Sequence, residues 1–250
     1  FFSFHYAASN VASRFGKPTH MISGIYLPLN TKESDLRIIA KSLGDEAKKY
    51  GVIVTAGQTA TYFGLEIPLL TSTCMGIEVR PPKKPRVGDT VLLVGEVGGE
   101  AVWLDMLAKG FDYEGWKKFT PLQVILSLHN VNHVKIMHDV SEGGVFGALY
   151  EIAEGHNVMI DALSKDIVFA DGTSDLDGEI LRAPTYGALI IIVSPDGVKE
   201  AKKKCQEIGV PCTVIGSVRD GTGFSMDGEP ITEQRRIDID EIYGSFSGDG

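Results

Sequence analysis

The chain has 250 residues, with 24 Lys and Arg against 33 Asp and Glu, which gives a formal net charge of -9. Hydrophobic residues at 43% and charged residues at 23% exclude a disordered chain, and the acidic balance argues against a nucleic-acid-binding protein, although it leaves phosphate ligands possible. The longest apolar runs are too short to span a bilayer, so we expect no membrane segment.

The first third of the chain predicts two helices and two strands. Small residues at helical spacing predict a helix within residues 5–18, ended by Gly16 and Pro18. Apolar spacing predicts a second helix over residues 31–50, with Gly51 as its C-cap. A buried strand follows over residues 51–55, and it ends in a polar loop that begins at Ala56. Another strand is predicted over residues 69–77.

A break follows at residues 80–86 (RPPKKPR), where three prolines exclude a regular helix or strand. Beyond it, hydrophobic patterning predicts strands over residues 90–95, 134–138, 186–193 and 212–218, the last of them closing the fold, and helices after residue 144 and over residues 197–208. The sequence therefore predicts an α+β protein of two domains, residues 1–83 and 84–250.

Three cysteines, Cys74, Cys205 and Cys212, lack metal-ligand spacing and leave an odd thiol. This pattern fits a reducing compartment, and nothing at the start resembles a signal peptide. We therefore expect a cytoplasmic protein.

Residues 138–144 (HDVSEGG) form the first candidate site, because polar side chains gather where a buried strand meets a helix. His138 can exchange protons, Asp139 can orient it or hold a cation, and the two glycines allow backbone amides to approach an anion. The alternative is an ordinary capped turn with Ser141 as N-cap and Glu142 in the first helical turn.

A second candidate is the polar segment 56–61, which suits phosphate or sugar hydroxyls, although by itself the pattern favours an ordinary polar loop. In the predicted helix of residues 5–18, Asn10 faces either a site or a neighbouring element. Residues 95–100 (GEVGGE) do not have dinucleotide-binding spacing, and the chain contains neither a P-loop nor a G-x-S-x-G elbow.

Taken together, these segments resemble the aminoimidazole ribonucleotide (AIR) synthase-related, or PurM-like, superfamily. Residues 138–144 with 147–153 (GALYEIA) are similar to a run typical of its HypE-like branch, and residues 85–95 (PRVGDTVLLVG) resemble the opening of its C-terminal domain. Residues 214–218 (VIGSV) resemble that domain's closing motif. Residues 56–59 and 8–18 occupy the places of two N-terminal motifs.

The resemblance implies a fold and an activity. The fold is an N-terminal dimerising α/β-sheet domain followed by a C-terminal α+β domain. The activity is ATP- and Mg²⁺-dependent phosphoryl transfer to an amide or similar acceptor, with nucleotide between the domains and across a homodimer. The implied catalytic residues are His138, Asp139 and Glu142. The implied cofactor-binding residues are Asn10, Gly57, Gln58, Thr59, Ser141, Gly143 and Gly144, whereas the metal ligands are unknown.

Several departures from the family pattern limit this transfer of function. Asn10 and Gln58 stand where the family has acidic residues, and amides bring no negative charge to Mg²⁺. A metal-binding segment of the family would precede residue 1. No cysteine follows Cys212, so we do not expect HypE-type carbamoyl chemistry.

The leading hypothesis is an ATP-dependent enzyme acting on a small-molecule or protein amide, without nucleic-acid or membrane partners. Two alternatives stay open: a non-catalytic nucleotide-binding homologue or assembly subunit, and a small-molecule kinase of the thiamine monophosphate type.

Overall fold

The computed structural model describes residues 1–176 and 178–231; residues 232–250, which contain no cysteine, lie outside them. The chain divides into two compact units, Phe1–Pro81 and Pro82–Gly250. Each contains one β-sheet with helices packed on it, so the α+β fold class is confirmed.

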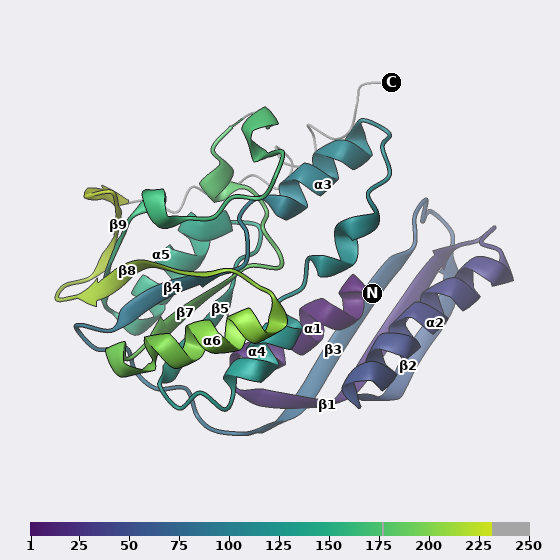
Figure 1. Ribbon diagram of the computed structural model, residues 1–250. Coiled ribbons are helices and arrows are strands. Elements are labelled where there is room, and N and C mark those ends of the chain that lie inside the picture. Colours follow the sequence, from purple (N-terminus) through teal and green to yellow (C-terminus); the bar gives the residue numbers. More distant parts are fainter. Residues whose placement is uncertain (177, 232–250) are drawn as a thin grey trace. The chain divides into compact units, whose positions relative to one another are not determined.

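The first unit has a three-stranded sheet in the order β2-β1-β3. Its elements are α1 (Phe2–Ser13), β1 (Gly16–Pro28), α2 (Glu33–Tyr50), β2 (Ile53–Tyr62) and β3 (Leu69–Glu78). Strand β1 runs parallel to β2 and antiparallel to β3. The two helices lie on the same face of the sheet (Figure 1), and the imidazole of His5 in α1 lies 2.9 Å from the Glu46 carboxylate in α2.

Glycines let α1 lie close to the sheet. A Cβ on Gly76 would come within 2.5 Å of both the Lys17 carbonyl oxygen and the Val11 side chain, and one on Gly16 would come within 2.9 Å of Val11. The close approach buries Phe4, Ala8 and Ala12 on the inner side of α1. Packing of this apolar helix face therefore holds the unit together.

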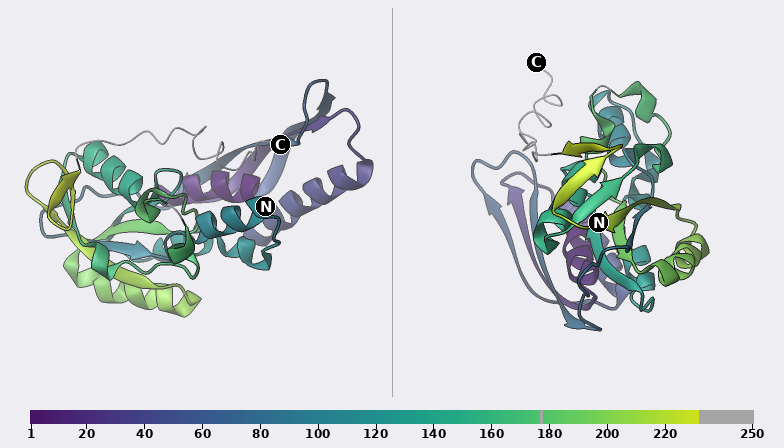
Figure 2. Two further views of the ribbon diagram at one scale, coloured as in Figure 1. Left: turned by 90° about the horizontal axis from the view of Figure 1, so that it is seen from above. Right: turned by 90° about the vertical axis from the view of Figure 1, so that its left-hand side faces the viewer.

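Among the described residues of this unit, no helix covers the opposite face of the sheet (Figure 2). Alternation along β1 and β3 places every second side chain there. Large apolar side chains on this face are exposed, from 42% for Ile22 to 68% for Ile77, and they include Ile53, Leu69 and Met75. We call these five residues the open apolar face.

The second unit has a seven-stranded sheet in the order β10-β9-β6-β8-β4-β7-β5. The strands are β4 (Thr90–Val94), β5 (Val134–Asp139), β6 (Met159–Ala162), β7 (Leu189–Val193), β8 (Cys212–Arg219), β9 (Gly223–Met226) and β10 (Glu229–Ile231). The helices are α3 (Gly99–Ala108), α4 (Leu122–Leu128), α5 (Gly144–His156) and α6 (Val198–Ile208).

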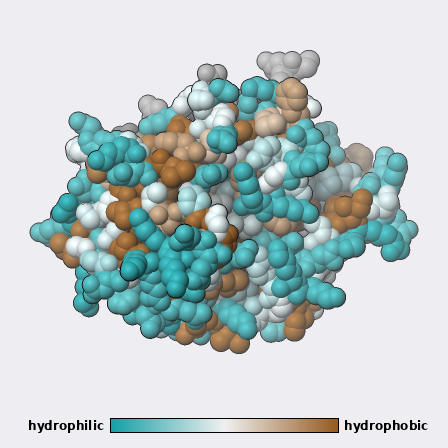
Figure 3. Space-filling view, in the orientation of Figure 1, coloured by the Kyte–Doolittle hydropathy of each residue, from teal (hydrophilic) through white to brown (hydrophobic). Residues whose placement is uncertain are grey.

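Helices cover both faces of this sheet, with α5 on one and α4 and α6 on the other (Figure 1). The inner side of α5 joins alternate residues of β4 and β7 in one core, for example Leu149, Val91 and Ile190, all fully buried. The outward side of α6 carries lysines and forms a hydrophilic surface (Figure 3). Because helices cover both faces of the sheet, β7 is buried and apolar on both faces.

A buried ion pair links the start of β5 to the residue before β4. The Lys135 ammonium lies 2.7 Å and 2.6 Å from the two carboxylate oxygens of Asp89, and these residues are 9% and 3% exposed. The Asp89 carboxylate also accepts a hydrogen bond from the Arg86 backbone N–H at 2.6 Å. The backbone carbonyl of Asp89 accepts one from the Val218 N–H at 2.8 Å. The pair therefore joins the linker to three strands of the sheet.

Several sequence predictions are confirmed and others are corrected. The helix that ends at Gly51 is present, and Gly51 adopts the left-handed conformation of a C-cap. Strand β2 is longer than predicted, however, and β7 is shorter because residues 186–188 precede it. The strand of residues 212–218 does not close the fold, because β9 and β10 follow. The sequence predictions do not include strands β1 and β6 or helices α3 and α4.

The missed strand β1 has a physical explanation. It contains Gly16 and Pro18, residues typical of a helix end, and proline is unusual in the middle strand of a sheet. A register shift between Pro18 and His20 interrupts the pairing with β3 there.

Among the residues that the structure describes, no helix is both long and apolar enough to cross a membrane.

Candidate functional site

Two turns leave the same edge of the larger sheet. Strands β4 and β5 both pair antiparallel with β7, which lies between them, so they run in the same direction. Their last residues, Val94 and Asp139, both lie opposite Leu189, the first residue of β7. The turn after β4 and the turn after β5 therefore flank the segment that enters β7.

That segment, residues 181–188, is bonded to both turns. The Ala188 carbonyl accepts the Val140 N–H at 3.1 Å. On the other side, the Gly98 N–H donates to the Thr185 hydroxyl at 3.2 Å, and the Tyr186 N–H donates to the Glu100 carboxylate at 2.7 Å. These bonds fix the two turns relative to one another.

The glycines of the two turns are required by packing within the chain. Gly144 has φ +60°, and a Cβ there would lie 2.4 Å from the Leu181 carbonyl oxygen. Gly98 has φ +82°, and its Cβ would meet the Ile180 and Thr173 side chains at 2.7 Å. The chain itself thus fills the space beside both glycines, and beside Gly144 this space was expected to face a ligand.

Helices α3 and α5 start at this edge, each with a glycine, Gly98 or Gly143, as its N-cap. A glycine N-cap has no side chain to bond the first backbone N–H groups, and helix N-termini carry partial positive charge. The alternative prediction of Ser141 as the N-cap is wrong; its carbonyl instead accepts the Gly144 N–H at 2.9 Å. The edge is chemically suited to an anion such as a phosphate.

His138 and Asp139 lie at the end of β5 and are partly exposed. The His138 ring places Nδ1 2.8 Å from the Asp139 backbone carbonyl and Nε2 3.2 Å from the Glu151 carboxylate of α5. Both nitrogens face oxygen acceptors, so the ring donates two hydrogen bonds only as the imidazolium. It is the Asp139 carbonyl, and not the carboxylate foreseen in the sequence analysis, that contacts this ring.

Glu100 is a site residue that the sequence analysis missed. It lies in the first turn of α3, is only 9% exposed, and accepts the Tyr186 N–H. Burial, with the negative charge of Glu142 adding to it, raises the pKa of Glu100 above its ordinary value, although the Tyr186 bond opposes the shift. The sequence signal that could have identified Glu100 is its position directly after two glycines at the start of a helix.

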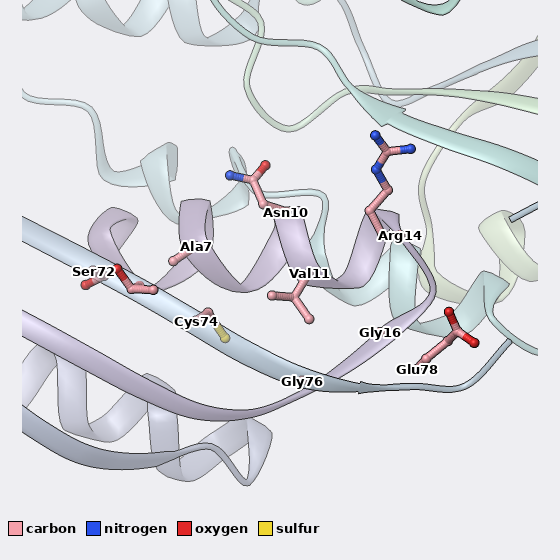
Figure 4. A pocket seen from close by; sticks show the side chains of 10 residues that line it. Ala7, Asn10, Val11, Arg14, Gly16, Ser72, Cys74, Gly76 and Glu78 are labelled. Atoms are coloured by element: carbon pink, nitrogen blue, oxygen red, sulfur yellow. The ribbon is translucent and has the colours of Figure 1, made fainter. Parts of the chain in front are cut away.

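In the first unit, Asn10 lines a cavity of about 520 Å³ bounded by α1 and β3. Ala7 and Val11 point from α1 toward β3, whereas Asn10 and Arg14 point away from it (Figure 4). The sequence signal for this position was the spacing of small residues, which in the structure serves the packing of α1.

Gly57, Gln58 and Thr59 do not form a loop at a strand end, as predicted, but lie inside β2. Gly57 lies opposite Ser23 of β1, and a Cβ there would come 2.4 Å from the Ser23 carbonyl oxygen, so glycine is required for strand pairing. Gln58 is exposed beside Gly24 on the face opposite the helices. It is therefore not brought together with Asn10.

The described residues do not fit a magnesium site. They contain no group of three or more His, Cys, Asp or Glu side chains able to hold a metal ion. Mg²⁺ prefers several oxygen ligands, usually including carboxylates, whereas Asn10 and Gln58 are neutral amides.

Comparison with known proteins shows the same two-part organisation. The AIR synthase related protein, N-terminal domain, matches residues 3–78, and the corresponding C-terminal domain matches residues 86–229.

Three curated relatives are similar over most of this chain. Carbamoyl dehydratase HypE of Bradyrhizobium diazoefficiens is 24% identical over 236 residues, covering 85% of this chain and 66% of the relative. A putative hydrogenase expression/formation protein of Methanocaldococcus jannaschii is 24% identical, covering 80% and 62%. The chain thus spans just under two thirds of these two relatives. Thiamine-monophosphate kinase of Pyrococcus horikoshii is 26% identical, covering 92% and 74%.

Solved structures share the fold. Escherichia coli HypE, a hydrogenase maturation protein, superposes with a TM-score of 0.81 at 18% identity, covering 90% of this chain and 75% of that one. A HypE–HypF complex gives 0.78 at 19% identity, covering 90% and 79%. HypE in complex with ATP gives 0.76 at 20% identity, covering 87% and 70%. At these identities the similarity shows the fold alone.

Replacing Gly144 by alanine is expected to destabilise the second unit by more than 2 kcal/mol, about the scale of strain plus steric conflict. The new Cβ would meet the 181–182 backbone at a positive φ. Gly147→Ala, three residues further along α5, is the control, because nothing lies within 4 Å of its Cβ and alanine favours a helix by about 1 kcal/mol. Urea unfolding measures both, and equal midpoints for the two variants would refute the packing argument.

Glu100→Gln is expected to raise the free energy of unfolding at pH 7–8. The folded pKa of Glu100 lies above its unfolded value of 4.5, so its contribution to stability is present below pH 4.5 and is lost as pH rises through the folded pKa. Glutamine stays neutral and can still accept the Tyr186 bond. The gain should be about 1.4 kcal/mol for each unit of pKa elevation and should vanish near pH 4.

Exposed Glu96, in the turn after β4, provides the matched control for this charge change. Glu96→Gln should change the unfolding free energy by less than about 0.5 kcal/mol at all pH values. A Glu100→Gln variant that is less stable than wild type at pH 8 would contradict the assigned shift.

Proposed function

The chain belongs to the AIR synthase related protein family, and on that premise we propose that it is an ATP-using enzyme that activates an amide or similar acceptor by phosphoryl transfer. The observation that carries the proposal is the pair of helix N-termini, α3 and α5, at one edge of the larger sheet. One similar solved structure, that of HypE in complex with ATP, supports the choice of nucleotide.

The residues of the turn after β5 have distinct proposed roles. The backbone N–H groups that follow Gly143 and Gly144 in the first turn of α5 bind phosphate oxygens, because the Gly144 N–H is itself bonded to the Ser141 carbonyl, and the Ser141 hydroxyl adds a hydrogen bond. The His138 ring, which lies between the Asp139 carbonyl and the Glu151 carboxylate, can exchange a proton with the acceptor. Asp139 and Glu142 are the carboxylates available for proton transfer to or from the acceptor.

Phosphoryl transfer requires positioning and charge stabilisation more than covalent catalysis by the protein. Glycine-led helix starts and fixed backbone N–H groups supply such positioning. The role proposed for Asn10, Gly57, Gln58 and Thr59 in binding the cofactor receives less support, because the structure separates Asn10 from Gln58. Likewise, Mg²⁺ has no protein ligand set among the described residues, so the proposal does not depend on it.

Two alternatives remain distinct from this proposal. A non-catalytic nucleotide-binding homologue is favoured by the neutral side chains Asn10 and Gln58. A kinase of the thiamine monophosphate type is favoured by the Pyrococcus horikoshii relative, whose coverage is the more complete. ADP formation with and without thiamine monophosphate separates the three: binding without turnover supports the first alternative, and turnover only with thiamine monophosphate supports the second.

Titration calorimetry with ATP tests the nucleotide site. Wild type is expected to bind, and ATP at about 100 times its dissociation constant should stabilise the fold by about 2.7 kcal/mol. Ser141→Asp places a carboxylate beside the start of α5, where it suits the helix dipole but repels phosphate. We expect its ATP affinity to fall at least about tenfold, or about 1.4 kcal/mol, without loss of stability.

Ser194→Asp is the control because Ser194 follows β7 and precedes α6, at the opposite edge of the same sheet. It should bind ATP like wild type. Equal affinity of the two variants would move the nucleotide away from α5, and no binding by wild type would refute ATP use.

We also propose that two copies pair through the open apolar face of the first unit. Its five exposed apolar side chains lie together on one side of a sheet whose other side is covered, and contiguous apolar surface of this kind marks association sites. Burial of such side chains in a dimer would stabilise it by the hydrophobic effect.

Sedimentation equilibrium should therefore give twice the 27.0 kDa chain mass. Ile22→Glu, in the central strand β1, should weaken association at least about tenfold because it buries a charge. Ile38→Glu on the exposed side of α2 should leave the dimer intact. A monomeric wild type, or equal dissociation of both variants, would refute pairing through this face.

A further inference from the structure

A short helical turn lies against both helix starts at the candidate edge. It is η4 (Ile180–Arg182), at the beginning of the segment that enters β7. On one side, a Cβ on Gly98, the N-cap of α3, would lie 2.7 Å from the Ile180 side chain. On the other side, a Cβ on Gly144, the first residue of α5, would lie 2.7 Å from the Arg182 carbonyl carbon. The turn therefore places Arg182 beside the start of α5.

The Arg182 side chain is held over the first turn of α5. Its Cζ atom lies 4.7 Å from the ring centroid of Phe146, the third residue of that helix. Its Nε donates a hydrogen bond to the Glu179 carboxylate at 2.6 Å, and the side chain is 20% exposed. In the part of the chain that the structure describes, no hydrogen bond occupies the two terminal Nη groups. The ring and the Nε bond thus orient the guanidinium, and its Nη edge can still bind a ligand.

The distribution of charge at this edge points to the same residue. Residues 95–100, 138–144 and 180–188 form the edge, and Arg182 is the only lysine or arginine among them. The same segments carry four carboxyl groups, those of Glu96, Glu100, Asp139 and Glu142. A triphosphate is strongly anionic, so it needs a cation to bind beside these groups. Since the described residues contain no cluster able to hold a metal ion, the guanidinium is the fixed positive charge available.

We propose that the Arg182 guanidinium binds a phosphate group of the nucleotide at the start of α5. This inference rests on the proposed function and assigns the neutralisation of phosphate charge to a side chain of the chain itself. A guanidinium presents paired N–H donors that match two phosphate oxygens, and the backbone N–H groups of α5 donate to the same group. Glu179 acts as a positioning residue, because it fixes Nε while its negative charge opposes that of the phosphate.

Titration calorimetry of the full chain with ATP tests the assignment. Arg182→Gln should lower the affinity for ATP at least about tenfold, the scale of a hydrogen bond to a charged group. Arg182→Lys keeps the charge but loses the planar donor pair, so its affinity should lie between those of wild type and Arg182→Gln.

Arg219→Gln is the matched control, because it makes the same change of charge beside a carboxylate. Arg219 ends β8, is 62% exposed and lies 3.8 Å from Asp161. Its neighbour Ser217 pairs with Thr90, so Arg219 is at the edge of the sheet where β4 begins, opposite the candidate site. Its ATP affinity should stay within about twofold of wild type, since distant exposed charges are screened.

Glu179→Gln separates phosphate binding from a structural role of the Arg182–Glu179 pair. It removes a negative charge from beside the guanidinium, so ATP affinity should rise at least about twofold, opposite in sign to the effect of Arg182→Gln. If the pair served only to hold η4 in place, both variants would change the affinity in the same direction. Glu179→Gln keeps the arginine over Phe146, so it gives an answer even where Arg182→Gln is unstable.

The outcomes distinguish this inference from the function on which it rests. Wild type that does not bind ATP would refute the proposed function and this assignment with it. Wild type that binds ATP while Arg182→Gln binds equally well, or while Glu179→Gln binds more weakly, would overturn the role of Arg182 alone.

Discussion

The second unit depends on one buried ion pair, between Lys135 and Asp89. A charge removed from water is costly unless it is paired and fully bonded, and Asp89 meets this condition with the Lys135 ammonium and a backbone N–H. Breaking pairs of this kind typically costs about 3–5 kcal/mol. Because Asp89 directly precedes β4 and Lys135 lies in β5, the pair fixes the two strands at the ends opposite the candidate site.

The position of the candidate site follows from this arrangement. With β4 and β5 parallel and β7 between them, two turns and two helix starts must emerge at one edge. The bonds from Thr185, Tyr186 and Ala188 then hold these turns in place. Backbone N–H groups fixed in this way provide positioning for an anion before it binds, which is the contribution that phosphoryl transfer requires.

Much of the fold could be predicted from sequence, because the signals were local. The helix ending at Gly51 has periodic apolar residues and a clear C-cap, and the two-domain family was identified from short motifs. Strand β1 could not be found because its tolerance of Pro18 depends on a register shift that only the paired strand reveals. Glu100 could not be predicted as a site residue because its burial depends on a segment 86 residues away along the chain.

Gly144 has a consequence for how such chains are recognised. Its side of the turn is closed by the chain's own backbone at residues 181–182, so any descendant that keeps this fold must keep a glycine there, whether or not it retains an active catalyst. A glycine at this position therefore reports that the fold is kept and does not report the activity. No such packing constraint fixes the residue type at Asn10 or Gln58. A loss or change of chemistry would therefore show as a substitution at positions such as these.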